Sequence, residues 1–383
     1  MKTVLALIIS ITAFASTDCW GEPTPAQLCT MDLEVIPAFL LENDAGARPH
    51  LKQFGQKQLD DALARAKEAA QAVPDAGACD NVLRQYLKTW RKGHLNLQIL
   101  HPAPAASGPA GTSAPAAKIS NAKEPQLSTL SRQTMLLTLH SFANQYREPL
   151  IALLTRHHGE LANHRNLIVD VRGNGGGSDS SYAPLLPWLL SDETATVGAE
   201  WLSTPANIRG QEQLCAQIAP GDTLCEKDAK AAVTRMRSVE PGQYISQDDA
   251  GVVQFERAKQ AERKRPSRIA ILVDGRCASS CEEFLLIARQ SFSVKLVGQP
   301  SFGSLDYSNL RPYDLPSEQR VLWYATSRSL RLPNFPVDLA GVQPDIYLPV
   351  ANDDPDSKGE VERVKRWLEG GSLAPAKSAP APR

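Results

Sequence analysis

Two apolar runs organise this chain of 383 residues. NLIVDVR (166–172) and RIAILVD (268–274) are nearly continuous in Val, Ile and Leu, as is typical of strands buried on both faces of a parallel sheet. Helical segments follow both runs, as APLLPWLL and CEEFLLIARQ. Strands that alternate with helices indicate an α/β fold with a mostly parallel sheet flanked by helices. The run at 320–332 is expected to continue this sheet.

The segments outside these runs predict the organisation of the rest of the chain. Apolar spacing predicts helices between Gln53 and Trp90, interrupted at Gly77 and Cys79, and HLNLQIL (94–100) alternates as a strand does. Residues 101–118 are mostly Ala, Pro, Gly and Ser, which cannot bury enough surface to fold. We expect a signal peptide (1–15), an N-terminal helical region (16–93), a strand and Pro/Ala/Gly-rich linker (94–133), an α/β core (134–350) and a C-terminal helix with a disordered tail (351–383).

The first residues predict export. One Lys precedes an apolar run from Val4 to Ile11, and Ala13-Phe14-Ala15 forms a cleavage site, so the mature chain is expected to begin at Ser16. The apolar run is too short to span a bilayer, so no stable membrane insertion is expected. The destination is a periplasm or the cell exterior, where disulfides persist.

Charge excludes one class of partner. Lys and Arg number 41 against 42 Asp and Glu, a formal net charge of −1. This balance excludes the basic field that a nucleic-acid-binding protein needs.

Seven Cys leave one without a partner inside the chain. Cys215 and Cys225 bracket a Pro-Gly-Asp turn and form the preferred pair, and Cys29 with Cys79 is a second candidate. Cys19 is then the expected spare. Cys277 and Cys281 lie two residues either side of Ser279, and either a bridge or two buried thiols fits their spacing.

The segment GRCASSCEEF (275–284) is the first candidate for chemistry. It joins an apolar strand to a helix, so Ser279 lies at a helix N-terminus, where free amides favour a developing negative charge. The alternative is structural: Ser279 and Glu282 have capping-box spacing, and taken alone this segment favours the cap. The G-x-S-x-G motif of α/β-hydrolases is absent.

A glycine cluster follows the first apolar strand. Four glycines occur within residues 173–177, which is more than a tight turn requires and favours a site lined by backbone amides. The segment lacks the third glycine of a dinucleotide fingerprint and the Lys-Ser/Thr of a P-loop, so a nucleotide-dependent enzyme is poorly supported.

Histidine offers a base but no metal site. Of seven His, His94 opens a strand directly after a helix, at the kind of element boundary where active-site residues gather. The alternative is an ordinary solvated or hydrogen-bonded His. The remaining His form no H-E-x-x-H motif, and no Cys pair has zinc spacing beside a suitable His.

Four segments in order resemble the core of the tail-specific (C-terminal processing) and tricorn-type serine peptidases. They are LIVDVRGNGGG (167–177), ILVDGRCASSCEEF (271–284), VGQPSFGS (297–304) and GVQPDIYLP (341–349). The resemblance implies a crotonase/ClpP-like sheet core, a peptide or protein substrate and no metal or cofactor. It maps the nucleophile onto Ser279, the base onto His94 in KGHL and the acidic orienter onto Asp338. Backbone amides of Gly175 or Gly176 and of Ser280 would then form the oxyanion hole.

Three departures from the family pattern leave a second hypothesis open. Ser304 stands where bacterial tail-specific members have their Lys base, Asp338 replaces the usual Glu, and no PDZ domain precedes the core. The main hypothesis is an exported serine endopeptidase with a Ser279–His94–Asp338 triad. The alternative is a catalytically silent peptide- or ligand-binding protein on the same fold.

Overall fold

The computed structural model describes most of the chain. The described residues are 22–100, 124–190, 193–249, 251–257, 265–349 and 358–373. The expected signal peptide, Cys19, the Pro/Ala/Gly-rich stretch 101–118 and nearly all of the C-terminal tail lie outside them.

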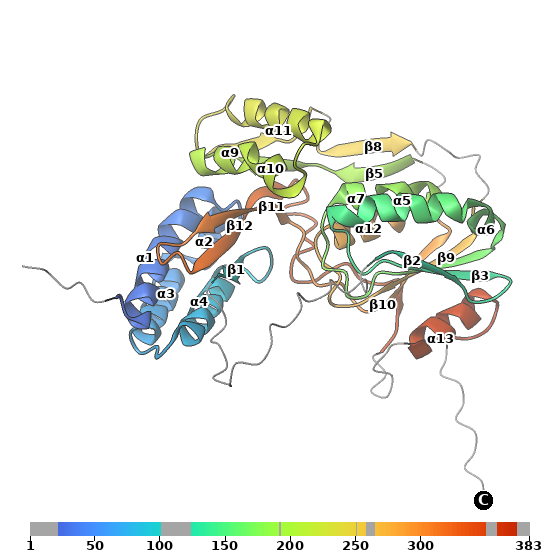
Figure 1. Cartoon of the computed structure of the whole chain (residues 1–383), viewed down its shortest axis with the longest axis horizontal. Coiled ribbons are helices and arrows are strands. Elements are labelled where there is room, and N and C mark those ends of the chain that lie inside the picture. The colour runs from blue at the N-terminus through green and yellow to red at the C-terminus, as the bar shows by residue number, and fades with distance from the viewer. Residues whose placement is uncertain are drawn as a thin grey trace, which may run out of the picture.

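The six-stranded sheet forms the centre of the α/β core (Figure 1). Both apolar runs become its central neighbours, β4 and β9, and four of its five pairings are parallel; only β2 and β3 pair antiparallel. The prediction of a mostly parallel sheet is therefore confirmed. In spatial order the strands are β13 (Ile346–Tyr347), β10 (Val294–Gly298), β9 (Arg268–Val273), β4 (Asn166–Asp170), β3 (Thr134–Thr138) and β2 (Gln126–Thr129).

Alternate side chains of the central strands enter two hydrophobic clusters, one on each face of the sheet. Leu167 and Val169 pack in the larger cluster, whereas Ile168 between them packs against the C-terminal helix. Figure 1 shows α5, α7 and α12 on one face and α13 on the other. The covering elements are η2 (Asn144–Tyr146), α5 (Arg147–Arg156), α6 (His158–Asn163), α7 (Asp179–Tyr182), η3 (Ala183–Leu185), α8 (Leu186–Leu189), α12 (Ser280–Ala288) and α13 (Lys358–Leu368).

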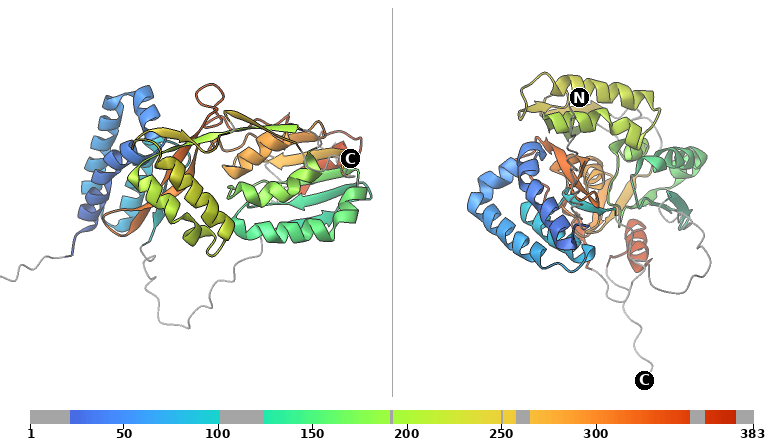
Figure 2. Two further views of the ribbon diagram at one scale, coloured as in Figure 1. Left: turned by 90° about the horizontal axis from the view of Figure 1, so that it is seen from above. Right: turned by 60° about the vertical axis from the view of Figure 1, so that its left-hand side comes forward.

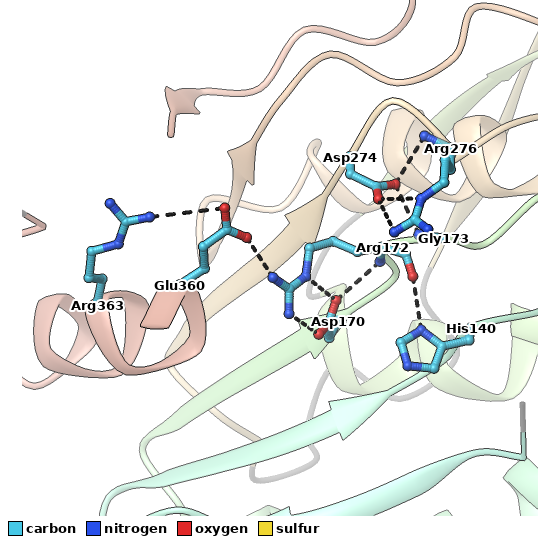
Figure 3. Close-up of polar contacts among 8 residues, drawn as sticks. All are labelled: His140, Asp170, Arg172, Gly173, Asp274, Arg276, Glu360 and Arg363. Atoms are coloured by element: carbon cyan, nitrogen blue, oxygen red, sulfur yellow. Dashed lines mark hydrogen bonds and ion pairs between the residues drawn. The ribbon is translucent and has the colours of Figure 1, made fainter. Parts of the chain in front are cut away.

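Ion pairs hold α13 at the carboxyl ends of the central strands (Figure 3). The Arg172 guanidinium bonds Asp170 at the end of β4 and reaches Glu360 of α13, in both cases at 2.5 Å. Asp274, just after β9, accepts from the Gly173 amide at 2.9 Å. Because Asp274 also accepts from the Arg276 amide, it ties the glycine-rich loop to the turn that leads into α12.

The run at 320–332 was expected to extend the parallel sheet, and this was wrong. It forms β12 (Arg320–Ser329), the centre of a separate five-stranded antiparallel sheet. The strand is buried on both faces: Leu322 and Tyr324 pack against the N-terminal helices, and Val321 and Ala325 on the opposite face are buried as well. Its partners are β1 (Asn96–Ile99), β6 (Ala199–Leu202) and β11 (Tyr307–Asp314), and β7 (Tyr244–Ser246) pairs with β6.

Helices cover the outer side of this second sheet at the N-terminal end of the molecule (Figures 1 and 2). Thr24 and Asp75 cap α1 and α4 through their side chains. The predicted interruption at Gly77 and Cys79 is displaced: both residues lie in the first turn of α4, and the break precedes it. The helices are α1 (Pro25–Asn43), α2 (Ala47–Phe54), α3 (Gln56–Gln71) and α4 (Ala76–Trp90).

A smaller helical and strand layer lies over the junction of the two sheets. Three helices connect β6 to β7, and a two-stranded ribbon borders α12, where Gln290 hydrogen-bonds the backbone of Ala195 in both directions. These elements are α9 (Pro205–Glu212), α10 (Leu214–Ile218), α11 (Thr223–Met236), β5 (Glu193–Val197) and β8 (Val253–Arg257). No described helix is long and apolar enough to cross a membrane.

Arg320 joins the second sheet to the N-terminal helices through a buried ion triad. Its guanidinium lies 3.0 Å from Asp32 of α1 and 2.6 Å from Asp80 of α4, and its side chain is 1% exposed. We expect Arg320→Met to lower the free energy of unfolding by about 3–5 kcal/mol, because two buried carboxylates lose their cation. Urea unfolding measures the change. Arg235→Met, which breaks the exposed pair with Asp249, is the control and should lower the free energy of unfolding far less, because water screens an exposed pair. Equal losses in the two variants would contradict the prediction.

Candidate active site

Ser279 lies at the N-cap of α12 in a backbone conformation that capping does not require. Its φ is 59° and its ψ is −126°. Thr24 and Asp75, which also cap helices, both have extended backbone, as N-cap residues ordinarily do. A non-glycine residue at this φ costs about 1–3 kcal/mol, and such strain gathers at functional sites. Ser279 is thus a helix cap, as one reading of the sequence held, but its strain points to a further role.

Glu282 holds this turn from beneath. Its carboxylate is fully buried and accepts from the Ser279 amide at 3.1 Å, the carboxylate half of a capping box. It also accepts from the amides of Gly303 and Ser304, at 2.7 and 2.8 Å, and from the Ser301 hydroxyl. Burial raises the pKa of Glu282, and these hydrogen bonds act against the rise. The sequence identified Glu282 as part of the cap, but it did not predict the hydrogen bonds from Glu282 to residues 301–304.

The glycine-rich loop packs directly against the Ser279 turn. A Cβ at Gly176 would lie 2.7 Å from the Ala278 carbonyl oxygen and 2.9 Å from the Ser279 Cβ, so only glycine fits there. The Gly176 amide donates to the Asn174 side chain at 2.9 Å. The amides of Gly175 and Ser280 donate to no acceptor in the described part of the chain. Of the three predicted oxyanion donors, these two therefore keep an unused amide hydrogen, whereas the Gly176 amide is already bonded.

His94 has a defined tautomer. Its Nδ1 hydrogen-bonds the backbone carbonyl of Tyr307, and a carbonyl only accepts, so Nδ1 carries the proton and Nε2 is a free acceptor in the neutral ring. Burial lowers the pKa of His94 to about 4, and the Arg91 cation acts in the same direction. The ring is therefore neutral at physiological pH, which is the state a general base requires. His94 also has a positive φ, 52°.

The turn that carries His94 packs against the same stretch of chain as the Ser279 turn. A Cβ at Gly93 would lie 2.4 Å from the Ser304 Oγ, while the Ser304 carbonyl accepts from the Ser279 amide at 3.1 Å. Arg91 clamps the turn by donating to the carbonyls of Gly93 and His94, at 2.8 and 3.0 Å. Ser304 thus links the candidate nucleophile and the candidate base.

Asp338 lies in this region, and its recorded partners are backbone amides. Its carboxylate accepts from Leu305 and Asp306, each at 2.7 Å, and the Asp306 carboxylate accepts from the Asp338 amide in return, at 2.8 Å. Burial raises the pKa of Asp338. The group bonded to His94 Nδ1 is the Tyr307 carbonyl, which follows the segment that Asp338 holds. Direct orientation of His94 by Asp338 stays a prediction.

The described residues form three disulfides. Cys29–Cys79 joins α1 to α4, and Cys215–Cys225 joins α10 to α11, as the sequence predicted. The third, Cys277–Cys281, was left open between a bridge and two thiols, and it spans Ser279. Within the described ranges, no three His, Cys, Asp or Glu side chains gather as metal ligands would.

Comparison with known proteins identifies the family. The sequence model of peptidase family S41 matches residues 133–348, more than half of the chain. The chain belongs to peptidase family S41. It is therefore a serine-type peptidase, and its substrates are peptides or proteins. No curated protein sequence matches it.

Solved structures share the fold of this S41 peptidase over nearly its whole length. Mature CPAF superposes with a TM-score of 0.59 at 12% identity, covering 92% of this chain and 100% of that one. A candidate peptidase from Parabacteroides merdae superposes with a TM-score of 0.53 at 16% identity, covering 92% and 98%. The second sheet and the N-terminal helices therefore belong to an arrangement found in other proteins.

Proposed function

We propose that the protein is an exported serine endopeptidase that cleaves peptide bonds through an acyl-enzyme formed on Ser279. The observation that carries the proposal is the strained Ser279 at the helix N-terminus, linked through Ser304 to a neutral His94 with a free Nε2. A nucleophile needs a neighbouring base, and the base needs a third group that fixes its tautomer. In this protein the Tyr307 carbonyl supplies that third group.

Each group has one task in the reaction. His94 Nε2 takes the Ser279 proton as the hydroxyl attacks the scissile carbonyl, and later returns it to the leaving amine. The amides of Ser280 and Gly175 stabilise the oxyanion, assisted by the N-terminal end of α12. Asp338 acts on His94 through the backbone: it holds the amides of Leu305 and Asp306 and so positions the next carbonyl, that of Tyr307.

The N-terminal apolar run and the three disulfides support export. Disulfides persist in oxidising compartments such as the periplasm and the cell exterior and are rare in the cytosol. Mass spectrometry of protein recovered from outside the cytoplasm tests this part of the proposal, and the expected mature N-terminus is Ser16.

A fluorophosphonate probe tests the chemistry. We expect one adduct per chain, and peptide mapping should place it on Ser279. Wild-type protein that stays unlabelled and cleaves no peptide, yet binds peptides, would instead support the catalytically silent alternative.

The rate of probe labelling should depend on pH through His94. The base must be neutral, so the rate should stay level from pH 8 down to about pH 5 and then fall as pH drops through the His94 pKa of about 4. An unperturbed His would instead lose activity near pH 6.5. The profile is measured by quenching the labelling reaction at fixed times at each pH. Circular dichroism confirms that the protein is folded at each pH. A midpoint near 6.5 would contradict the buried, neutral His94.

A further inference from the structure

The Cys277–Cys281 bridge encloses the candidate nucleophile. Three residues lie between the two cysteines, and Ser279 is the middle one. Both cysteines are fully buried in the main hydrophobic cluster, whereas Ser279 between them is part-exposed. The bridge therefore closes a short covalent ring whose apex is the residue with the strained backbone.

Hydrogen bonds join residues 277–278 of this ring to neighbouring loops. The Cys277 carbonyl accepts from the Phe302 amide at 2.8 Å, and the Ala278 amide donates to the Asn174 carbonyl at 3.1 Å. All of these bonds fix the segment to neighbouring loops. Within the turn the Cys281 amide also donates to the Ala278 carbonyl at 3.1 Å, and the disulfide is the covalent link between the side chains at the two ends. Without it, Ser279 could relax toward the extended conformation that Thr24 and Asp75 adopt at their helix N-termini.

The position of the bridge fits a local role better than a global one. In the chain-entropy account, the stabilisation from a disulfide grows with the length of the loop that it closes. Cys277–Cys281 closes a separation of 4 residues, whereas Cys29–Cys79 closes 50. The shorter bridge is thus the weaker contributor to overall stability, although it lies closest to the reacting group.

We propose that the Cys277–Cys281 disulfide is a positioning device that holds Ser279 in its reactive backbone conformation, so that peptidase activity depends on its oxidation. This inference rests on the proposed function, in which Ser279 is the nucleophile. It adds a redox requirement that the serine–histidine chemistry does not itself contain.

Reduction of the full-length protein tests the proposal while keeping both sulfur atoms in the core. A water-soluble phosphine breaks the S–S bond, takes an oxygen from water to become the phosphine oxide, and leaves two thiols that carry the two protons. Alkylation and mass spectrometry identify which bridges have opened. We expect the maximal rate of fluorophosphonate labelling, kinact, to fall about tenfold to a hundredfold, because small misplacement of a reacting group has effects of that size. Its KI should change less than about twofold, and reoxidation should restore the rate.

Paired variants separate positioning from folding. Cys277→Ala/Cys281→Ala should show the same loss of kinact, with a melting temperature within about 4 °C of wild type, the largest shift that about 1 kcal/mol produces in domains of about 150–250 residues. Cys215→Ala/Cys225→Ala removes another short bridge, of separation 10, and should keep kinact. A kinact unchanged by loss of the 277–281 bond would overturn the proposal. A loss of kinact that occurs together with unfolding, as measured by circular dichroism, would also overturn the proposal. Wild-type protein that never reacts with the probe would contradict the proposed function instead.

Discussion

Ser279→Ala should lower kcat/KM for peptide cleavage by about 10⁴-fold or more and abolish fluorophosphonate labelling. Removal of the nucleophile leaves only the contribution of binding and of the oxyanion donors, and loss of the serine in a Ser-His site has effects of this size. A fluorogenic peptide pool measures the cleavage rate. The fold should be kept, because Glu282 and the Ser304 carbonyl still hold the turn through the Ser279 backbone amide.

Ser280→Ala is the matched control. Ser280 carries the adjacent hydroxyl. Its backbone amide, the candidate oxyanion donor, is unchanged by the substitution. We expect cleavage within about threefold of wild type. Loss of activity in Ser280→Ala together with activity in Ser279→Ala would transfer the nucleophile to Ser280. Full activity in both variants would show that neither serine is the nucleophile.

His94→Gly should lower kcat/KM by about 10²–10⁴-fold, the usual contribution of a general base. Glycine suits this position because φ is 52°, where a side chain is strained and glycine is not. The melting temperature should therefore change little, so that a loss of rate reports the missing imidazole. Added imidazole should restore part of the activity by occupying the space beside the Tyr307 carbonyl. His164→Ala, at a half-buried His whose ring bonds the Glu160 backbone carbonyl, should leave the rate unchanged.

The outcome of the imidazole experiment separates two roles of His94. A base is replaced in part by the free molecule, whereas a residue that only shapes the turn is not. If His94→Gly keeps more than about half of the wild-type rate, His94 is not the base. A rate that is lost together with the folded state would assign His94 to structure.

Local patterns predicted the central part of the fold. Nearly continuous apolar runs predicted strands β4 and β9, because a strand that is buried on both faces carries apolar side chains on both. Two features of the candidate site could also be predicted from local sequence. The glycine cluster indicated a close approach of backbone segments, because only glycine fits there, and the helix N-terminus at Ser279 followed from the known spacing of capping residues. The pairs Cys29–Cys79 and Cys215–Cys225 followed from the positions of the cysteines together with the expectation of export.

Other features of the fold and of the candidate site could not be predicted from short stretches of sequence. Strand β12 has the pattern of a parallel central strand, yet it lies in the antiparallel sheet, because burial on both faces does not say which strands are its neighbours. The Tyr307 carbonyl that holds His94 carries no sequence signal, since every residue has a carbonyl. The second set of Glu282 contacts joins two separate segments, since Gly303 lies 21 positions further along the chain.

The sequence by itself determined the residue types at the candidate site, the parallel core and the family, because each depends on short-range spacing and on which residues a buried strand or tight turn tolerates. Tertiary structure alone decided the positive φ of Ser279, the tautomer and low pKa of His94 and the closure of the 277–281 bridge. These features depend on contacts with residues from many parts of the chain. A strained backbone persists only where the surrounding packing holds it, and the pKa of His94 falls because burial removes water from the ring.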